Sequence, residues 1–104
     1  MSFVGKGIPP ETLQQIRDRI DIVDVISRHV TLSKTGQNFK GLCPFHSEKS
    51  PSFSVSPSRQ MFHCFGCAVG GDAITFLMKQ EGLGFMEAVQ ELAQLSGVTL
   101  TIED

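Results

Sequence analysis

Two short stretches decide the fold of this chain, Cys43-Pro44-Phe45-His46 and Cys64-Phe65-Gly66-Cys67. Each stretch holds two metal-ligand side chains with two residues between them, and 17 residues separate one stretch from the other. Three thiolates and one imidazole form a common structural Zn²⁺ set, and two such pairs about 15–20 residues apart have the spacing of a zinc ribbon. The sequence therefore predicts one structural zinc ion with four ligands: Cys43, His46, Cys64 and Cys67.

Other uses of the cysteines fit the sequence less well. With three cysteines, internal disulfides would leave one over, and no secretory signal precedes them. A thioredoxin-like redox pair at Cys64 and Cys67 would need a βαβ setting and would give Cys43 and His46 no function. His63 neighbours Cys64, and because side chains alternate along a strand, we expect it to face away from the metal.

The length indicates one small domain, and the helices and strands predicted below give it an α+β fold class. The 104 residues suffice for a modest core, and no apolar run approaches the roughly 18 residues of a membrane span, so no membrane partner is expected. The first residues lack a secretory apolar region, and reduced thiols suit the cytoplasm, so we expect a cytoplasmic protein. We expect residues 1–7 to form a flexible lead and residues 8–104 to form the domain.

Capping signals predict helices on both sides of the ribbon. Asp21 and Asp72 stand where N-caps are expected, and Gly82 and Gly97 stand where helices should end. The predicted helices cover residues 10–20, 22–29, 72–81 and 84–96, which gives helical flanks over residues 10–29 and 72–96.

Alternating segments predict a small antiparallel sheet inside a ribbon of about residues 30–70. The predicted strands are residues 30–34, residues 39–42 and the two arms of a hairpin over 53–63. A further strand is expected at 98–102, so the sheet should have about four to five strands. Residues 68–71 are expected to be a flexible exit from the second ligand pair. The phenylalanines at 45, 53 and 65 should pack around the zinc knuckles, and those at 39 and 62 should lie in the core.

The charge of the chain is unevenly distributed. The net charge is −2, yet residues 28–67 carry five basic side chains and one acidic side chain. Residues 68–104 carry one basic and six acidic side chains. The basic stretch coincides with the ribbon, which favours contacts with the phosphates of a single strand. The candidate phosphate contacts are Lys34, Lys40, Lys49 and Arg59.

Polar side chains of the same stretch could supply hydrogen bonds to exposed base edges. They are Gln37, Asn38, Ser54, Ser56 and Gln60. No catalytic residue is predicted, because four protein ligands close the zinc site and the chain has no P-loop or carboxylate cluster suited to Mg²⁺. The alternative is a structural zinc ribbon that docks a protein partner, with its basic face on an acidic surface.

Residues 36–53, Gly-Gln-Asn-Phe-Lys-Gly-Leu-Cys-Pro-Phe-His-Ser-Glu-Lys-Ser-Pro-Ser-Phe, resemble the first half of a known domain. That domain is the N-terminal zinc-binding domain of bacterial replicative DNA primase (DnaG type, with a CHC2 zinc ribbon). Phe62-His63-Cys64-Phe65-Gly66-Cys67 resembles its second half, and residues 20–26 and 70–78 match its flanks. The resemblance covers nearly all of residues 8–102.

The resemblance implies a zinc ribbon that binds single-stranded DNA template and helps to select the initiation site. It implies a parent DNA primase, a DNA-directed RNA polymerase that starts primers for DNA replication. The polymerase domain, with its Mg²⁺, would follow this chain, so the fragment alone is expected to be non-catalytic. Implied partners are the template, the polymerase domain in cis or in trans and, through the full-length protein, the replicative helicase. Glu48 and Pro51 lie in the loop where base readout or contact with the initiating nucleotide would be expected.

Overall fold

The computed structural model describes residues 8–47 and 49–98, and these form four helices and one five-stranded antiparallel sheet. The predicted α+β class with a ribbon between helical flanks is confirmed. The predicted lead over residues 1–7 and residues 99–102 of the predicted last strand lie outside the described residues. The elements are α1 (Pro10–Arg19), α2 (Ile22–Ser27), β1 (Ser33–Thr35), β2 (Asn38–Gly41), β3 (Phe53–Ser56), β4 (Met61–Cys64), β5 (Gly70–Gly71), α3 (Ala73–Glu81) and α4 (Phe85–Ser96).

Four of the helix ends lie at the predicted capping residues Asp21, Asp72, Gly82 and Gly97. The Asp21 carboxylate accepts a hydrogen bond from the N–H of Val23 at 3.0 Å and so caps α2. Gly82 and Gly97 end α3 and α4 with positive φ values of 67° and 77°, which glycine adopts without a steric penalty. Within the described residues, no helix is long and apolar enough to cross a lipid bilayer.

The first part of the ribbon differs from the prediction. α2 ends at Ser27, and the next residues form a terminal turn in which the N–H groups of His29 and Val30 both bond to Ile26 O. Val30 is buried in that turn, so the strand predicted for residues 30–34 begins only at Ser33. Val30 was assigned to a strand because it begins an alternating apolar and polar segment. A buried residue in the last turn of a helix gives the same pattern, so alternation alone could not distinguish the two.

The exit from the second ligand pair is also different, because Gly70 and Gly71 form strand β5. Ala68 has a positive φ of 64° and turns the chain back, and its N–H bonds to Cys64 O at 2.8 Å. The Cys64 N–H in turn bonds to Val69 O at 2.8 Å. The prediction of a flexible exit for residues 68–71 was wrong, since this tight turn pairs the glycines with β4.

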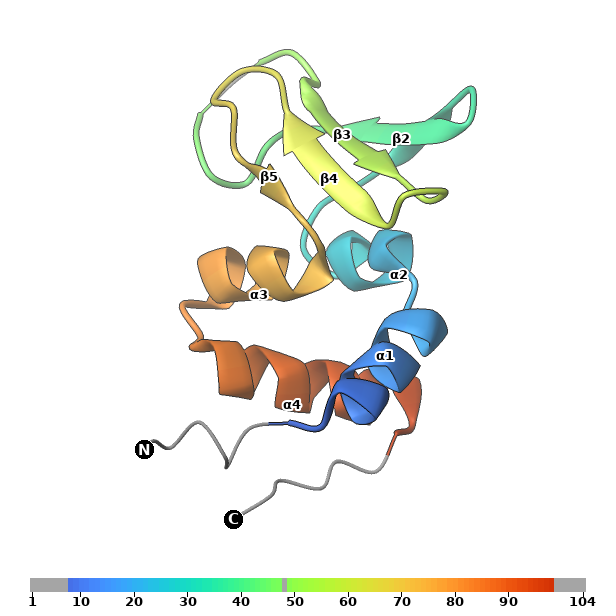
Figure 1. Cartoon of the computed structure of the whole chain (residues 1–104). Helices are drawn as coiled ribbons and strands as arrows, with labels where there is room; N and C mark the ends of the chain where they lie inside the picture. The colour runs from blue at the N-terminus through green and yellow to red at the C-terminus, as the bar shows by residue number, and fades with distance from the viewer. Residues whose placement is uncertain (1–7, 48, 99–104) are drawn as a thin grey trace.

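The sheet has the order β1-β2-β3-β4-β5, and every neighbouring pair is antiparallel. In Figure 1 the sheet lies above the helices, with α2 and α3 next to it and α4 beyond α3. Side chains on the helical face are buried and form one core with the helices. Phe76 of α3 joins the layers, since its ring centroid lies 6.2 Å from that of Phe53, 5.6 Å from that of Phe62 and 5.7 Å from that of Phe45.

The opposite face of the sheet, which we call the open face, carries no helix (Figure 1). The register places Lys40 beside Ser54, Ser54 beside His63, and His63 beside Gly70 in one row across four strands. Because side chains alternate along each strand, Phe53 and Phe62 point into the core while Ser54 and His63 do not. The fold therefore presents one polar, helix-free surface next to the predicted metal ligands.

Candidate metal centre and the open face of the sheet

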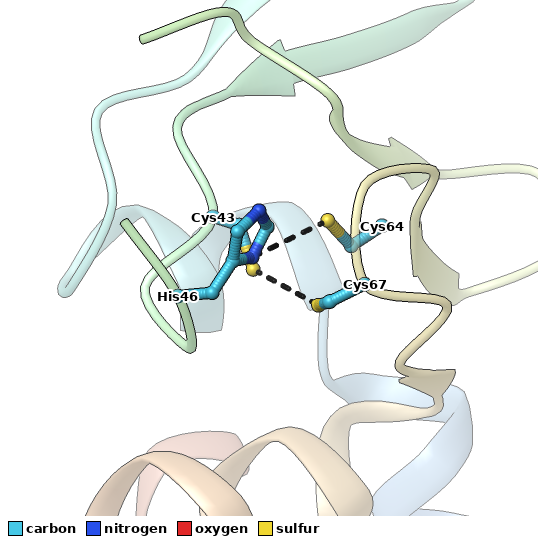
Figure 2. A group of neighbouring side chains, drawn as sticks. All are labelled: Cys43, His46, Cys64 and Cys67. Atoms are coloured by element: carbon cyan, nitrogen blue, oxygen red, sulfur yellow. Dashed lines mark hydrogen bonds between the residues drawn. The ribbon is translucent and has the colours of Figure 1, made fainter. Parts of the chain in front are cut away.

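The structure brings the four predicted ligands together in one group of side chains, which we call the metal cluster. Cys43 and His46 face Cys64 and Cys67 across a small gap (Figure 2). The ligand atoms of all four residues lie within 4.8 Å of one another, and the three cysteines, all in the described part of the chain, form no disulfide. Cys64 ends β4, and Cys43 follows β2 after one residue, so two strands of the sheet that flank β3 position one residue of each ligand pair.

The distances suit a tetrahedral zinc ion. Cys43 Sγ lies 3.8 Å from Cys67 Sγ, and Cys64 Sγ lies 4.0 Å from His46 Nδ1. Two sulfurs at the usual Zn–S distance of about 2.3 Å from a tetrahedral ion are roughly 3.8 Å apart. The thiolate-rich donor set and its spacing therefore fit Zn²⁺ better than Mg²⁺ or Ca²⁺, which take oxygen ligands.

Backbone N–H groups point at the sulfurs of the cluster. Phe45 N–H donates to Cys43 Sγ at 3.4 Å, and Gly66 N–H donates to Cys64 Sγ at 3.3 Å. Ser52 Oγ lies 3.6 Å from Cys64 Sγ, and Ser52 O accepts a bond from Phe65 N–H at 2.9 Å. These contacts fix both turns around the cluster and favour the thiolate forms that a metal requires.

The surroundings shift the pKa values of the Cys43 and Cys64 thiols in opposite directions. Burial raises the pKa of the Cys43 thiol to about 12, and the neighbouring cysteine thiols add to the effect. Burial acts in the same direction on Cys64, but hydrogen bonds from Ser52 and from the N–H groups of Cys67 and Gly66 prevail and lower its pKa to about 7. Because a metal binds the thiolate form, metal binding at Cys43 would release the proton of its thiol.

Gly66 leaves room for the imidazole of His46. A Cβ at this position would lie 2.9 Å from His46 Nε2 and 2.9 Å from Ser52 Oγ. Real Cβ atoms essentially never come so close, so either the ring or the hydroxyl would have to move. The glycine of the second ligand pair therefore belongs to the geometry of the site as much as the ligands do.

His63 and Phe65 lie outside the metal cluster. His63 is exposed, as strand alternation predicted, and it is not among the grouped ligand residues. Phe65 was predicted to pack around the zinc knuckle, which is wrong, because its side chain is 73% exposed. Its ring contacts His63 edge to face, with centroids 4.6 Å apart and planes at 70°. Phe45 and Phe53, by contrast, pack inward, since Phe53 is fully buried and the two ring centroids lie 6.3 Å apart.

A shallow groove of about 400 Å³ lies on the open face of the sheet. Most of the polar side chains predicted to bond base edges line it, and the aromatic pair stands beside them. Its lining includes Asn38, Ser54, Ser56, Arg59, His63 and Phe65. Sequence reasoning did not select His63 and Phe65 as surface contacts. The available signals were the alternation that exposes His63 on β4 and the position of Phe65 in the turn that follows.

The predicted basic contacts are all exposed but do not share one surface. Arg59 lines the groove, and Lys40 lies on the open face beside Ser54. Lys34 of the edge strand β1 pairs with Phe39, which packs against the core. Lys34 therefore lies on the helical face of the sheet and not on the open face. Lys49 lines a separate hollow beside Cys43 and His46.

The remaining predicted loop contacts lie between the first ligand pair and β3. Pro51 is exposed, next to Ser52, which bonds the metal cluster. Glu48 lies outside the described residues. Gln60, which was predicted to bond bases, does not line the groove, because its amide is engaged elsewhere in the fold.

Comparisons with known proteins agree with this geometry. Residues 8–104 match the CHC2 zinc finger family. The DNA primase of Geobacillus stearothermophilus is 57% identical over 99 residues, which are 95% of this chain and 17% of the relative. The DNA primase of Thermotoga maritima is 46% identical over 95 residues, which are 91% of this chain and 17% of the relative.

A solved structure gives the same result. The crystal structure of the Aquifex aeolicus primase, with its zinc-binding and RNA polymerase domains, aligns with a TM-score of 0.82 and 50% identity. The alignment covers 86% of this chain and 22% of that one. This chain thus spans less than a fifth of the length of the two primases compared above. The sequence match, the shared fold and the clustered cysteines and histidine lead to one conclusion: this chain belongs to the CHC2 zinc finger family.

Proposed function

We propose that this chain is the template-recognition module of a DNA primase. It binds single-stranded DNA, helps to select the site where a primer begins, and helps a polymerase domain to start the RNA primer. Its relatives are DNA primases, and the open face of its sheet offers the kinds of groups that unpaired bases and phosphates require.

Cys43, His46, Cys64 and Cys67 would hold one structural zinc ion. Four protein ligands leave no open coordination position, so the ion supplies rigidity rather than reaction chemistry. The zinc ion would stabilise the fold because its ligands join the end of β4 to the loop after β2. A sheet held in this way keeps the open face in one shape before the template binds.

The groove on the open face is the observation that carries the proposal. Ser54 and Ser56 offer hydroxyl donors and acceptors, and Asn38 offers an amide, which together suit base edges. The exposed rings of His63 and Phe65 offer stacking surfaces, each worth about 1–3 kcal/mol per base in other single-strand binders. The two rings contact each other on the exposed side of the sheet, where they are accessible to a bound base.

Two cations lie at the groove, where a phosphate backbone would run. Lys40 stands in the row next to Ser54, and Arg59 lines the groove at its turn end. Lys49 and Pro51 belong to the loop beside the metal cluster, where the initiating nucleotide or a further template base would lie. Lys34, at the sheet edge, would add a more distant phosphate contact.

The remainder of the primase would supply the chemistry. We propose that a polymerase domain with Mg²⁺ acts with this chain, in cis or in trans, and that the full-length protein meets the replicative helicase. The zinc-binding and RNA polymerase domains of the Aquifex aeolicus primase, which share one solved structure, support this arrangement. The chain itself would then have no catalytic residue.

Binding to a fluorescent single-stranded DNA, measured by anisotropy over a range of salt concentrations, tests the proposal. Zinc-loaded protein should bind with an affinity that falls as salt rises. Phe65→Ala should weaken binding about tenfold through lost stacking and leave the melting temperature nearly unchanged, because the ring is exposed. Phe85→Ala is the matched control, since Phe85 is also exposed but lies on α4, away from the groove.

Two results would contradict the proposal. If the zinc-loaded chain fails to bind single-stranded DNA at low salt, template recognition is wrong and docking of a protein partner becomes the better explanation. If Phe65→Ala and Phe85→Ala behave alike, the open face is not the binding surface. Priming by the polymerase fragment on varied templates, with this chain added in trans, then measures the effect on initiation.

A further inference from the structure

Gln60, in the turn between β3 and β4, has an unusual backbone conformation. Its φ is 53°, and within the described residues only Ala68 shares a positive φ without being glycine. This region is sterically unfavourable for a residue with a Cβ, and glutamine lacks the short side chain with which Asn or Asp offsets that cost. Such strain persists only where neighbouring contacts hold it in place.

The side-chain amide of Gln60 makes those contacts. Its Oε1 accepts a hydrogen bond from the N–H of Ile22 at 2.8 Å, and its Nε2 donates to Pro57 O at 2.8 Å. Ile22 is the first residue of α2, so its N–H has no partner within that helix. One amide thus closes the β3–β4 turn and ties it to a helix 38 residues away in sequence.

The turn that Gln60 closes is also the end of the groove on the open face. Arg59 and Met61, its two neighbours, both line that groove, whereas Gln60 does not. A guanidinium on an exposed turn has many conformations, and each lost conformation counts against binding. A turn fixed by two hydrogen bonds reduces that cost before the template arrives.

We propose that Gln60 is a positioning residue for template binding, which ties the β3–β4 turn to α2 and so holds Arg59 at the end of the groove. The inference rests on the proposed function, because it assumes that the groove binds single-stranded DNA. It assigns a role to the contact between the sheet and the helices. By linkage, a template held by Arg59 strengthens the bond between Gln60 and Ile22, so α2 responds to the bound strand.

The variant Gln60→Asn tests this role. Asparagine tolerates the left-handed conformation and keeps an amide, but it is one methylene too short to reach Ile22. The zinc-loaded variant should bind a fluorescent single-stranded DNA about three- to tenfold more weakly. In the background Arg59→Ala the same change should have no further effect, because the two residues act as one unit.

The difference in hydrogen exchange between the Ile22 and Val25 amides is a readout of this contact, because a loss of global stability would speed exchange at both. Gln60→Asn should speed exchange at Ile22 and leave Val25, whose N–H bonds to Asp21 O, unchanged. Added DNA should slow exchange at Ile22 in the wild type. Gln94→Asn, the same chemical change on an exposed part of α4, is the matched control and should change neither binding nor Ile22 exchange.

The outcomes separate the two proposals. If the wild type does not bind DNA, the proposed function fails. If the wild type binds and Arg59→Ala weakens binding while Gln60→Asn binds normally, only the role of Gln60 is overturned. If added DNA leaves exchange at Ile22 unchanged in the wild type, the coupling to α2 is overturned. Gln60→Gly, which removes both the strain and the amide, should weaken binding as Gln60→Asn does, and normal binding by it would also overturn the role.

Discussion

At the scale of single residues, the metal cluster depends on Gly66 as well as on its ligands. The position has space for a hydrogen and not for a methyl group, because His46 and Ser52 approach it from the same side. Ser52 also contacts the Cys64 sulfur, so a group forced between them acts on two parts of the cluster. Residues that orient metal ligands commonly change metal affinity by about 10- to 100-fold when altered.

The substitution Gly66→Ala is expected to weaken zinc binding about tenfold or more, because its Cβ displaces the His46 ring. Competition with a chromophoric chelator measures the affinity. The control is Gly84→Ala, where φ is −77° and the nearest atom to an added Cβ, Glu87 Oε1, is 3.5 Å away. Equal zinc affinity in the two variants would show that the His46 ring tolerates the displacement.

At the scale of elements, Asp72 connects α3, β5 and α1. Its carboxylate caps α3 by accepting from Thr75 N–H at 2.9 Å and from the Thr75 hydroxyl at 3.1 Å. Its second oxygen accepts from Arg17 of α1 at 3.0 Å. Burial alone would raise the pKa of Asp72, but the bonds from Thr75 and the charge of Arg17 prevail and lower it below its ordinary value of 3.8.

Asp72→Ala is expected to lower the free energy of unfolding by about 1 kcal/mol, mainly through the lost cap. Because the folded-state pKa is lowered, this contribution is complete above the unfolded pKa and is lost only as pH falls through the lower, folded-state pKa. The difference from wild type should therefore stay constant from about pH 8 to about pH 5.5 in chemical denaturation of the zinc-loaded protein.

Asp72→Asn separates the cap from the charge. Asparagine caps helices about as well as aspartate, so it should recover most of the stability and lose only the small, solvent-screened attraction to Arg17. A stability difference for Asp72→Ala that shrinks between neutral pH and about pH 5.5 would mean that another titrating group sets the effect.

At the scale of the whole molecule, the metal cluster and the helices share one core. Cys43 and Cys64 belong to the same cluster of buried residues as Phe76 of α3 and Leu92 of α4. Phe45, within the first ligand pair, contacts Phe76 directly, with ring centroids 5.7 Å apart. Damage to the metal site is therefore transmitted to the helices through aromatic packing.

Removal of zinc by a chelator is expected to unfold the sheet and the helices in one transition. Structural zinc contributes on the order of 10 kcal/mol in small domains, which is comparable with the whole stability of a domain of this size. Far-ultraviolet circular dichroism should lose its helical signal in parallel with hydrogen-exchange protection of the sheet. Persistence of the helical signal after the sheet amides have exchanged would show that the helices form a separate core.

Much of the fold follows from local patterns in the sequence. Asp21 and Asp72 cap helices where they were expected to, and Gly82 and Gly97 end them, because capping depends on a few neighbouring atoms. The hairpin around residues 57–60 also formed as predicted, with strands that pair in register. These features involve contacts close in the chain, so periodicity and turn chemistry were sufficient.

The sequence by itself also determined which four residues come together as a candidate metal centre. The spacing of the ligands is sufficient to predict their arrangement. The two ligands of each pair lie in one tight turn, and the hairpin between the pairs brings the second turn back beside the first. Burial of Phe53 and Phe62 followed in the same way from alternation along β3 and β4.

Only the tertiary structure decided which exposed residues share a surface. Phe65 is exposed and contacts His63. Lys34 and Lys40 lie on opposite faces of the sheet. The side chain of Gln60 forms a hydrogen bond with α2 instead of facing the groove. Each outcome depends on strand register or on contacts between segments distant in sequence. Hydrophobic periodicity reports whether a residue is buried, but it carries no information on which neighbours an exposed residue meets, since those are set by the packing of the whole chain.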